Sequence, residues 1–363
     1  MSTKDSNKKV STSEDDESTT YDKDSSWVLL GKREFGTGAT LEVNEVNGEV
    51  VGLSFRFSRA ADQIGGPFPV SLGSMSSLQV LDLRKCCDVT SLPESIGSLT
   101  QLKKLDLRRC EALTTLPTSI GQLKELRELD MSDCISITHL PETLGGLSNL
   151  NKLVIGGSGI TTGNKVLHYL PDSLCRLTNL LELDLSKCKE LRALPPNIGN
   201  LTSLTELQMR ECKCVTELPA SIGDLKSLHE LSLSKCVGLL SLPDSVGMLS
   251  SLDDLILTKC KSISYLPSSI SKLDTLVSLN LRGCKSLECL PDDMDQLHSL
   301  KKLDLSECKK LTILPDAIGR LVSLRSLSVQ KCPNLKEMPT SAFWLKSVTE
   351  GWPGEKLSSE VKE

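Results

Sequence analysis

The stretch LDLRRCEALTTLPTSIGQLKEL, residues 105–126, carries a pattern that recurs along most of this chain of 363 residues. With Leu102 as its first position, one unit reads LxxLxLxxCxxLxxLPxSIGxLxx and spans 24 residues. A looser copy runs upstream from Val50 to Met75. A period of this length predicts a solenoid, in which each unit contacts only its neighbours. Eleven clear units open at Leu78, Leu102, Leu126, Leu150, Leu180, Leu204, Leu228, Leu252, Leu276, Leu300 and Leu324.

Each half of the unit predicts its own local structure. The segment LxxLxL alternates with a period of two, which predicts a short strand with Leu105 and Leu107 on the inner face and Asp106 and Arg108 outside. The segment LPxSIGxLxx places a proline at the start of a short helical piece. Because strands approach to about 4.8 Å and helices only to about 8 to 10 Å, the stack must bend with its strands inside. We therefore expect an α/β solenoid shaped as a horseshoe, with a parallel concave sheet, short helical or 3-10 convex segments, and about 11–12 repeats of 24 residues.

The composition changes at both ends of the repeats. The first residues are rich in Ser, Thr, Asp, Glu and Lys and hold little that can be buried. The alternation around Asn47-Gly48 is a hairpin signal, and Trp344 and Trp352 are expected to close the far end of the core. The predicted domains are a disordered acidic tail at 1–26, an N-terminal cap with a hairpin and a degenerate first repeat at 27–77, eleven repeats at 78–347, and a C-terminal cap with a frayed tail at 348–363.

Ten cysteines occupy one place in the pattern, and all but one neighbouring pair are 24 residues apart. At this corner the side chain turns inward, where its weak S–H donor meets backbone carbonyls and the sulfur packs as a small hydrophobe. A zinc site needs several ligands that converge on one ion, whereas one thiol per repeat forms a line. We interpret the column as a structural ladder without metal or cofactor: Cys86, Cys110, Cys134, Cys188, Cys212, Cys236, Cys260, Cys284, Cys308 and Cys332.

Charge and composition restrict the function. The net charge of −5 and the pI near 5.6 argue against affinity for nucleic acid or an anionic membrane. No apolar run approaches the length of a spanning helix, and the first residues do not resemble a signal peptide, so we expect a cytoplasmic protein without membrane insertion. The four histidines fall in no catalytic or metal-binding motif, so we expect no enzymatic activity and no small-molecule substrate. A protein partner follows by elimination.

The outward strand positions are the candidate partner-binding residues. We interpret Asp82 and Asp106 as ion-pair partners of the basic residues of the first two units. Two interpretations remain open, because the charges either neutralise one another on a solvated face or form a polarised docking surface with a basic patch and an acidic strip. The candidates are the basic residues Arg84, Lys104, Arg108 and Arg109, followed by the acidic residues of the fifth to eighth units, Glu182, Glu206, Glu230 and Asp254.

The fourth unit, residues 150–179, is six residues longer than its neighbours. Counting from its first leucine puts Ser158 in the cysteine place, and we expect the segment from Ile160 to Tyr169 to loop out near a strand end. Loops on a rigid scaffold often carry recognition, which makes His168 and Tyr169 further candidates, while a neutral insertion remains the alternative.

The phrases LDLRRCEALTTLPTSIGQLKEL and LDLSECKKLTILPDAIGRLVSL resemble the leucine-rich repeats of plant intracellular TIR-type nucleotide-binding disease-resistance receptors. The chain has no GxxxxGK[ST] phosphate loop, and we expect neither a TIR nor a nucleotide-binding domain. The repeats are also similar to Ras-group leucine-rich-repeat scaffolds, which usually carry Asn in place of the cysteine. The resemblance implies a leucine-rich-repeat horseshoe that binds a protein on its concave face, in intracellular signalling or immune-type recognition. The alternative is a regulatory scaffold that recruits a phosphatase, a small GTPase or a ubiquitin ligase.

Overall fold

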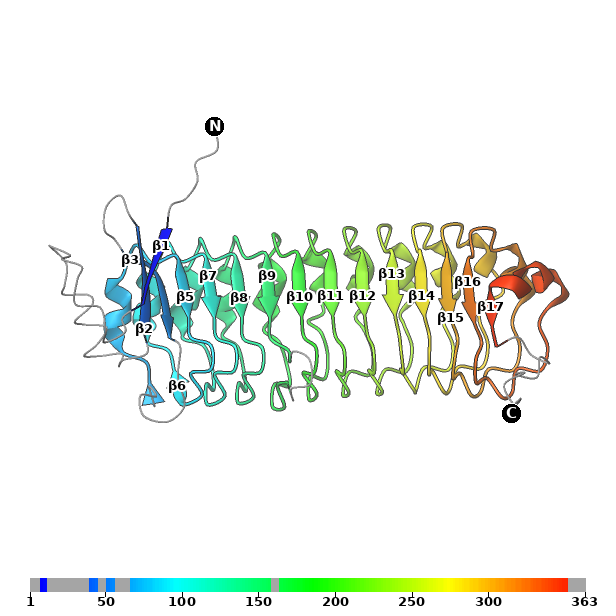
Figure 1. Cartoon of the computed structure of the whole chain (residues 1–363), viewed down its shortest axis with the longest axis horizontal. Helices are drawn as coiled ribbons and strands as arrows, with labels where there is room; N and C mark the ends of the chain where they lie inside the picture. The colour runs from blue at the N-terminus through cyan, green and yellow to red at the C-terminus, as the bar shows by residue number, and fades with distance from the viewer. Residues whose placement is uncertain (1–6, 12–38, 45–49, 56–65, 158–162, 352–363) are drawn as a thin grey trace, which may run out of the picture. The chain divides into compact units, whose positions relative to one another are not determined.

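The computed structural model describes residues 7–11, 39–44, 50–55, 66–157 and 163–351. The chain divides into two compact units, an N-terminal unit (Met1–Leu183) and a C-terminal unit (Asp184–Glu363). In each unit short parallel strands line one side and 3-10 segments the other (Figure 1). Most of the expected N-terminal tail, the Asn47-Gly48 dipeptide, Ser158, Trp352 and the C-terminal charged segment lie outside the described residues.

The strands of the N-terminal unit follow one another in sequence. Strand β1 pairs antiparallel with β2, and β2 pairs antiparallel with β3. The undescribed Asn47-Gly48 dipeptide lies between β2 and β3 in the sequence. From β3 onward the pairing is parallel. The strands are β1 (Asn7–Ser11), β2 (Ala39–Asn44), β3 (Val50–Phe55), β5 (Val80–Asp82), β7 (Lys104–Asp106), β8 (Glu128–Asp130) and β9 (Lys152–Val154), with β4 (Gly66–Pro67) and β6 (Val89–Ser91) as a separate pair.

The strands of the C-terminal unit are parallel and in register at each repeat, so that Leu207 lies opposite Leu231 and Leu231 opposite Leu255. Strand β10 (Glu182–Asp184) contains the point where the two units divide. The others are β11 (Glu206–Gln208), β12 (Glu230–Ser232), β13 (Asp254–Ile256), β14 (Ser278–Asn280), β15 (Lys302–Asp304), β16 (Ser326–Ser328) and β17 (Thr349–Glu350).

Short 3-10 segments follow the LP dipeptides. The prolines precede them with φ near −66°, as at Pro117, and the bonds run three residues back, with Ile120 N–H donating to Pro117 O at 3.1 Å. The segments are η1 (Val70–Ser74), η2 (Glu94–Ser98), η3 (Thr118–Gln122), η4 (Glu142–Gly146), η5 (Asp172–Arg176), η6 (Ile198–Asn200), η7 (Ala220–Asp224), η8 (Asp244–Met248), η9 (Ser268–Lys272), η10 (Met294–Gln296), η11 (Asp316–Arg320) and η12 (Thr340–Val348).

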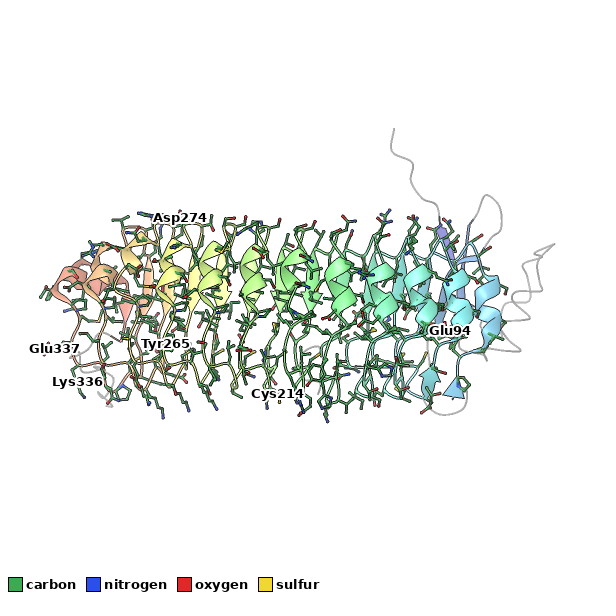
Figure 2. All side chains as sticks on the ribbon, turned by 180° about the vertical axis from the view of Figure 1, so that it is seen from behind. Glu94, Cys214, Tyr265, Asp274, Lys336 and Glu337 are labelled. Atoms are coloured by element: carbon green, nitrogen blue, oxygen red, sulfur yellow. The ribbon has the colours of Figure 1, made fainter. Side chains whose placement is uncertain are left out.

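The glycine of the SIG tripeptide lets successive 3-10 segments pack closely. A Cβ on Gly121 would overlap the carbonyl oxygen of Thr143 in the next repeat, and one on Gly223 would overlap that of Ser245. Figure 2 shows the side of the protein that carries these segments. The sequence prediction of a repeat solenoid with parallel strands and short 3-10 segments is confirmed.

The core of each unit is a stack of leucines, most of them without solvent exposure. At the beginning of the N-terminal unit Phe55 and Phe68 pack edge to face with ring centroids 5.5 Å apart. At the end of the C-terminal unit Leu345 is fully buried, whereas Trp344 is 48% exposed and donates its Nε1–H to Gly319 O at 2.7 Å. The prediction that Trp344 closes the core is therefore wrong, because the indole lies on the surface.

The residue before the ladder cysteine has a left-handed backbone in nearly every repeat. This conformation costs an L-residue roughly 1–2 kcal/mol. It lets the turn close, as where Cys260 N–H donates to Leu257 O at 3.1 Å. Gly283 occupies the same column with φ 75°. The non-glycine members, with φ between 57° and 65°, are Lys85, Arg109, Asp133, Lys187, Glu211, Lys235, Lys259, Glu307 and Lys331.

Replacing one of these residues by glycine should stabilise the protein. We expect Lys259→Gly to raise the free energy of unfolding by about 0.5 kcal/mol, since relief of strain exceeds the added entropy of the unfolded chain. The measurement is the urea midpoint. Lys261→Gly is the matched control, because Lys261 is exposed and has no left-handed backbone, and it should lower the midpoint. A decrease in both variants would contradict the expectation.

Candidate functional site

We call the surface formed by the third, fifth and seventh residues of the repeats the strand face of each unit. In the repeat that opens at Leu102 these residues are Lys104, Asp106 and Arg108. The strand register places equivalent residues of neighbouring repeats side by side, as with Asp106 and Asp130. Every outward side chain therefore belongs to a column that runs from strand to strand.

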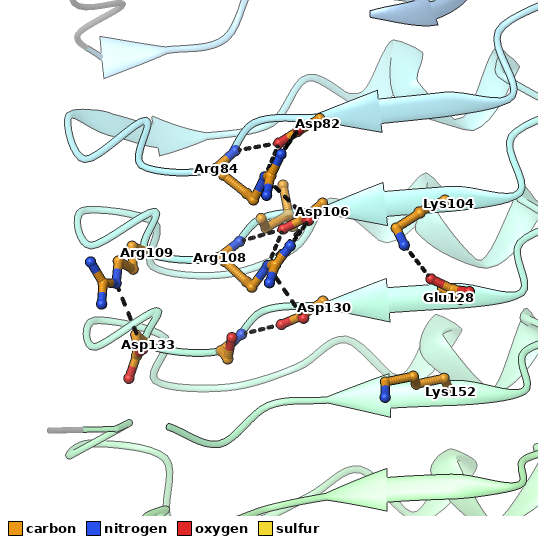
Figure 3. A network of polar contacts seen from close by, with 12 residues as sticks. Asp82, Arg84, Lys104, Asp106, Arg108, Arg109, Glu128, Asp130, Asp133 and Lys152 are labelled. Carbon is orange, nitrogen blue, oxygen red and sulfur yellow. Dashed lines mark hydrogen bonds and ion pairs between the residues drawn. The ribbon is translucent and has the colours of Figure 1, made fainter. Parts of the chain in front are cut away.

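A ladder of aspartates and arginines crosses the strand face of the N-terminal unit (Figure 3). Arg84 Nη2 donates to Asp82 Oδ2 at 2.6 Å, and Arg84 Nε lies 3.5 Å from Asp106 Oδ2. Arg108 repeats this arrangement one strand further, at 2.6 Å from Asp106 and 3.5 Å from Asp130. Each arginine thus connects the carboxylate of its own strand to that of the next, and its bonds to the first have the fork geometry of strong arginine–carboxylate pairs.

Two guanidinium groups cover Asp106. The strand alternation predicted its outward direction, and its exposure is only 3%. At Asp82 burial alone would raise the pKa, but the hydrogen bonds and charge of Arg84 outweigh it and hold the pKa below its usual value. The hydrogen bond to Asp82 in turn raises the pKa of Arg84. The prediction that these aspartates pair with the arginines is confirmed.

The remaining charged candidates of the N-terminal unit also lie against opposite charges. Lys104 Nζ is 2.6 Å from Glu128 Oε2, and Arg109 Nε is 3.9 Å from Asp133 Oδ2. Glu182, predicted as the first member of the acidic strip, accepts an ion pair from Lys152 at 2.6 Å. Burial alone would lower the pKa of Lys152, but the hydrogen bond and charge of Glu182, together with the charges of Asp130 and Glu128, outweigh it and raise the pKa. The charges of this strand face are largely neutralised within the unit.

Three carboxylates lie side by side on the strand face of the C-terminal unit, and we call them the acidic row. Glu206 pairs in register with Glu230, and Glu230 with Asp254. Gln208 Nε2 donates to Glu230 Oε1 at 2.7 Å. In the described part of the chain, no cationic side chain lies within ion-pair distance of the row. Like charges on neighbouring strands are unfavourable, so the row costs stability.

Asp254 shows this cost directly. Its Oδ1 is buried and has no hydrogen-bond partner among the described residues. Burial raises the pKa of Asp254 above the ordinary 3.8, and the charge of Glu230 adds to this effect, while a hydrogen bond from Ser278 acts in the opposite direction and is outweighed.

The long fourth repeat has a left-handed residue before the ladder place, as the other repeats do, but at a different residue from the one that counting forward assigned. Gly163 has a left-handed backbone with φ 65°, and Asn164, 1% exposed, follows it. Asn164 Nδ2 donates to Cys134 O at 3.0 Å and to Ile137 O at 2.9 Å. Asn164 therefore takes the cysteine place that counting forward gave to Ser158. Counting backward from Leu170 would have found it.

His168 and Tyr169 do not lie in a loop at a strand end, so this part of the prediction is wrong. A Cβ on Gly157 would come within 2.5 Å of Gly163 Cα, so the two glycines that border the undescribed residues 158–162 lie side by side. His168 and Tyr169 come after this point, on the ordinary segment before η5, with ring centroids 6.5 Å apart. Tyr169 is 60% exposed, but neither residue belongs to the strand face. A role for them in partner binding stays a prediction.

The ladder cysteines join each repeat to the one before it. Cys110 Sγ donates to Leu83 O at 3.2 Å, and Cys260 Sγ donates to Leu233 O at 3.0 Å. All fourteen cysteines are free thiols. Burial raises the pKa of Cys236 and of Cys284 to about 12, which disfavours the thiolate needed for metal binding or nucleophilic attack.

The sequence did not predict a groove on the strand face over β14 to β17. Its volume is about 290 Å³, near the lower end of the range for ligand pockets. Four serines, Ser278, Ser306, Ser326 and Ser328, leave it open. These serines are a signal in the sequence, but the groove also depends on where the side chain of Arg282 extends. The groove is lined in part by Asn280, Arg282, Lys302, Asp304, Ser306, Ser326, Ser328, Gln330 and Glu350.

Two further features of the described residues bear on function. They contain no group of three or more His, Cys, Asp or Glu side chains placed to hold a metal ion. Their helical segments include none that is long and apolar enough to span a membrane.

Comparison with family models matches residues 59–192 to a leucine-rich repeat region and residues 299–321 to a leucine-rich repeat. Together with the 24-residue period and the strand and 3-10 arrangement, these matches make the chain a leucine-rich-repeat protein. The fold is a general scaffold for protein–protein interaction. No curated protein sequence matches the chain significantly.

Solved structures give weak likenesses. A leucine-rich-repeat protein of Leptospira interrogans is 27% identical over 74% of this chain and 84% of that one, with a TM-score of 0.36. The leucine-rich repeat domain of the type III effector XopL is 27% identical over 69% and 72%, with a TM-score of 0.43. A plant peptide hormone receptor, solved in complex with RGF2, is 19% identical over 81% and 70%, with a TM-score of 0.34.

Thiol labelling should separate the ladder from the surface cysteines. With Ellman's reagent on the native protein we expect Cys214 and Cys289, which are exposed, to react first, and the half-buried Cys87 and Cys332 to react slowly. The ten buried thiols should react only after unfolding. Cys214→Ser/Cys289→Ser should remove the fast phase. Labelling of any of the ten buried cysteines in the native protein, seen by peptide mass spectrometry, would contradict the assignment.

Neutralising Asp254 should stabilise the protein at neutral pH. Because the folded pKa lies above the unfolded value of 3.8, the stability contributed by Asp254 falls as the pH rises from 3.8 through the raised pKa. We expect Asp254→Asn to raise the urea midpoint at neutral pH, and the gain to vanish below about pH 3. Glu206→Gln, at the exposed end of the row, should give a smaller gain. An equal gain at both pH values would show that the charge of Asp254 is not the cause.

Proposed function

We propose that this chain is a non-catalytic protein-interaction module that docks a protein partner on the strand face of its C-terminal unit. The observation that carries the proposal is the acidic row of Glu206, Glu230 and Asp254. These carboxylates are held in register and lack cationic partners in the described part of the chain, and like charges on neighbouring strands are unfavourable. A basic segment of a partner would supply the missing charge.

The N-terminal unit provides an internal comparison. There Arg84, Arg108 and Lys104 lie against carboxylates of their own strand face. A surface neutralised in this way gains little from a charged partner, because its ion pairs would have to be exchanged rather than formed. The unneutralised row of the C-terminal unit gives charge complementarity that sets both register and association rate.

The scaffold favours docking without rearrangement. The strand register fixes the spacing of Glu206 and Glu230 along the sheet, so little backbone freedom is lost when a partner binds. The expected setting is the cytoplasm, in intracellular signalling or immune-type recognition. This setting is supported by the resemblance of the repeat phrase LxLxxCxxLxxLP to the repeats of plant disease-resistance receptors.

Charge reversal in the acidic row tests the proposal. We expect Glu206→Lys/Glu230→Lys to weaken binding of a captured partner by about tenfold or more, because attraction becomes repulsion. The experiment compares affinity capture from cell extract by quantitative mass spectrometry and then measures each specific partner by calorimetry. Partner binding should also weaken as salt is raised.

The matched control reverses two charges elsewhere. Asp274 and Glu337 are exposed, lie outside the strand face and can be found in Figure 2. Asp274→Lys/Glu337→Lys changes the net charge by the same amount, and it should retain the partners. Equal capture by all three proteins would overturn the docking site. A captured phosphatase, GTPase or ubiquitin ligase that depends on the acidic row would identify the module as a recruiting scaffold.

A further inference from the structure

The N-terminal unit shows what an aspartate at the fifth position of a repeat binds. Asp82 Oδ1 accepts the backbone N–H of Arg84 at 3.1 Å, and Oδ2 accepts Nη2 of the same residue at 2.6 Å. Asp106 and Arg108 repeat both bonds at 3.2 Å and 2.6 Å. The backbone bond orients the carboxylate, and the guanidinium at the seventh position then occupies its second oxygen.

Asp304, in the groove of the C-terminal unit, is oriented in the same way but lacks the guanidinium. Its Oδ1 accepts the backbone N–H of Ser306 at 2.8 Å. The seventh position is Ser306 itself, whose hydroxyl lies 2.6 Å from Ser328 Oγ. Within the described ranges Asp304 forms no ion pair. The volume that an arginine fills in the first repeats is therefore part of the groove.

The arginine of the preceding repeat does not fill this place. Arg282 is the counterpart of Arg84, which extends from its own repeat to the aspartate of the next. Arg282 instead donates from Nη2 and Nε to Glu307 Oε1, at 2.7 Å and 3.2 Å. Arg282 lines the same groove and the charge of Asp304 acts on it, but its ion pair is with Glu307 and not with Asp304.

We propose that the groove binds the guanidinium group of an arginine side chain presented by a protein partner. Such an arginine would complete at Asp304 the pair that Arg84 and Arg108 form within the chain. Glu350, which accepts Gln330 Nε2 at 3.0 Å, is a second carboxylate lining the groove. The planar fork of arginine matches a carboxylate better than the point charge of lysine.

Lys302 influences which residue of the partner can lie next to the bound arginine. It lines the groove, is exposed, and lies two residues before Asp304 on β15. Its charge repels a purely basic segment, so an acidic residue adjacent to the arginine is favoured. The inference rests on the proposed function for the existence of a protein partner, but it concerns a different set of residues from the acidic row.

A small probe tests the groove without the partner. We expect Nα-acetyl-arginine amide, titrated into the full-length protein, to shift the amide signals of Ser306, Ser328 and Gln330 in a saturable way. Asp304→Asn should weaken this binding by about tenfold or more, since the charged half of the pair is lost. Nα-acetyl-citrulline amide, the neutral isostere, should not bind. Nα-acetyl-lysine amide should bind more weakly than the arginine compound.

A second variant fills the groove from within. Ser306→Arg recreates the sequence relation of Asp106 and Arg108, and it should abolish binding of the arginine probe while the thermal midpoint holds or rises. Unchanged binding in Asp304→Asn or in Ser306→Arg would overturn the inference, as would equal binding of the lysine compound. Because Glu206→Lys/Glu230→Lys leaves the groove intact, loss of the proposed docking site and loss of the arginine site give separate results.

Discussion

One backbone carbonyl in most repeats ties the turn of its own repeat to the next repeat. Leu107 O accepts the N–H of Cys110 in its own repeat at 3.0 Å and the thiol of Cys134 in the next at 3.1 Å. The first bond closes the turn, and the second ties that turn to its neighbour. A thiol suits this place because it is small, apolar enough to be buried and still a donor. The residue before the cysteine has a strained, left-handed backbone, and this strain is the cost of closing the turn.

Register turns the strand face into columns, and the charges in those columns decide what each unit can bind. In the first two repeats of the N-terminal unit the fifth residue is Asp and the seventh is Arg, so Asp82 and Asp106 are each closed by a guanidinium two residues away. In the C-terminal unit the third positions of three neighbouring repeats are acidic and have no such neighbour. The same geometry therefore stabilises one surface and leaves charge available on the other.

The period and the alternation within LxxLxL were enough to predict the strands, the 3-10 segments and the pairing of Asp82 and Asp106 with arginines. They were not enough where an insertion changes the length of a repeat, or where neighbouring side chains decide what is buried. Ser158 was assigned to the cysteine place because counting forward ignores where the insertion ends, whereas the buried amide of Asn164 marks the true turn. The alternation also gave the outward direction of Asp106 but not its burial, because it does not show what folds over a side chain. The groove depends on the partner that Arg282 takes, which no local pattern reveals.

The residue at the seventh position of a repeat decides whether the carboxylate two residues before it is covered. Where it is arginine, as at Arg108, the carboxylate is covered and the surface is complete without a partner. Where it is serine, as at Ser306, the same backbone hydrogen bond orients the carboxylate but nothing within the repeat covers it. Exposed ion pairs contribute only about 0–1 kcal/mol, so closing Asp304 internally would stabilise the fold little. An open, oriented carboxylate costs equally little, and it leaves a repeat scaffold with a recognition position that one residue can open or close.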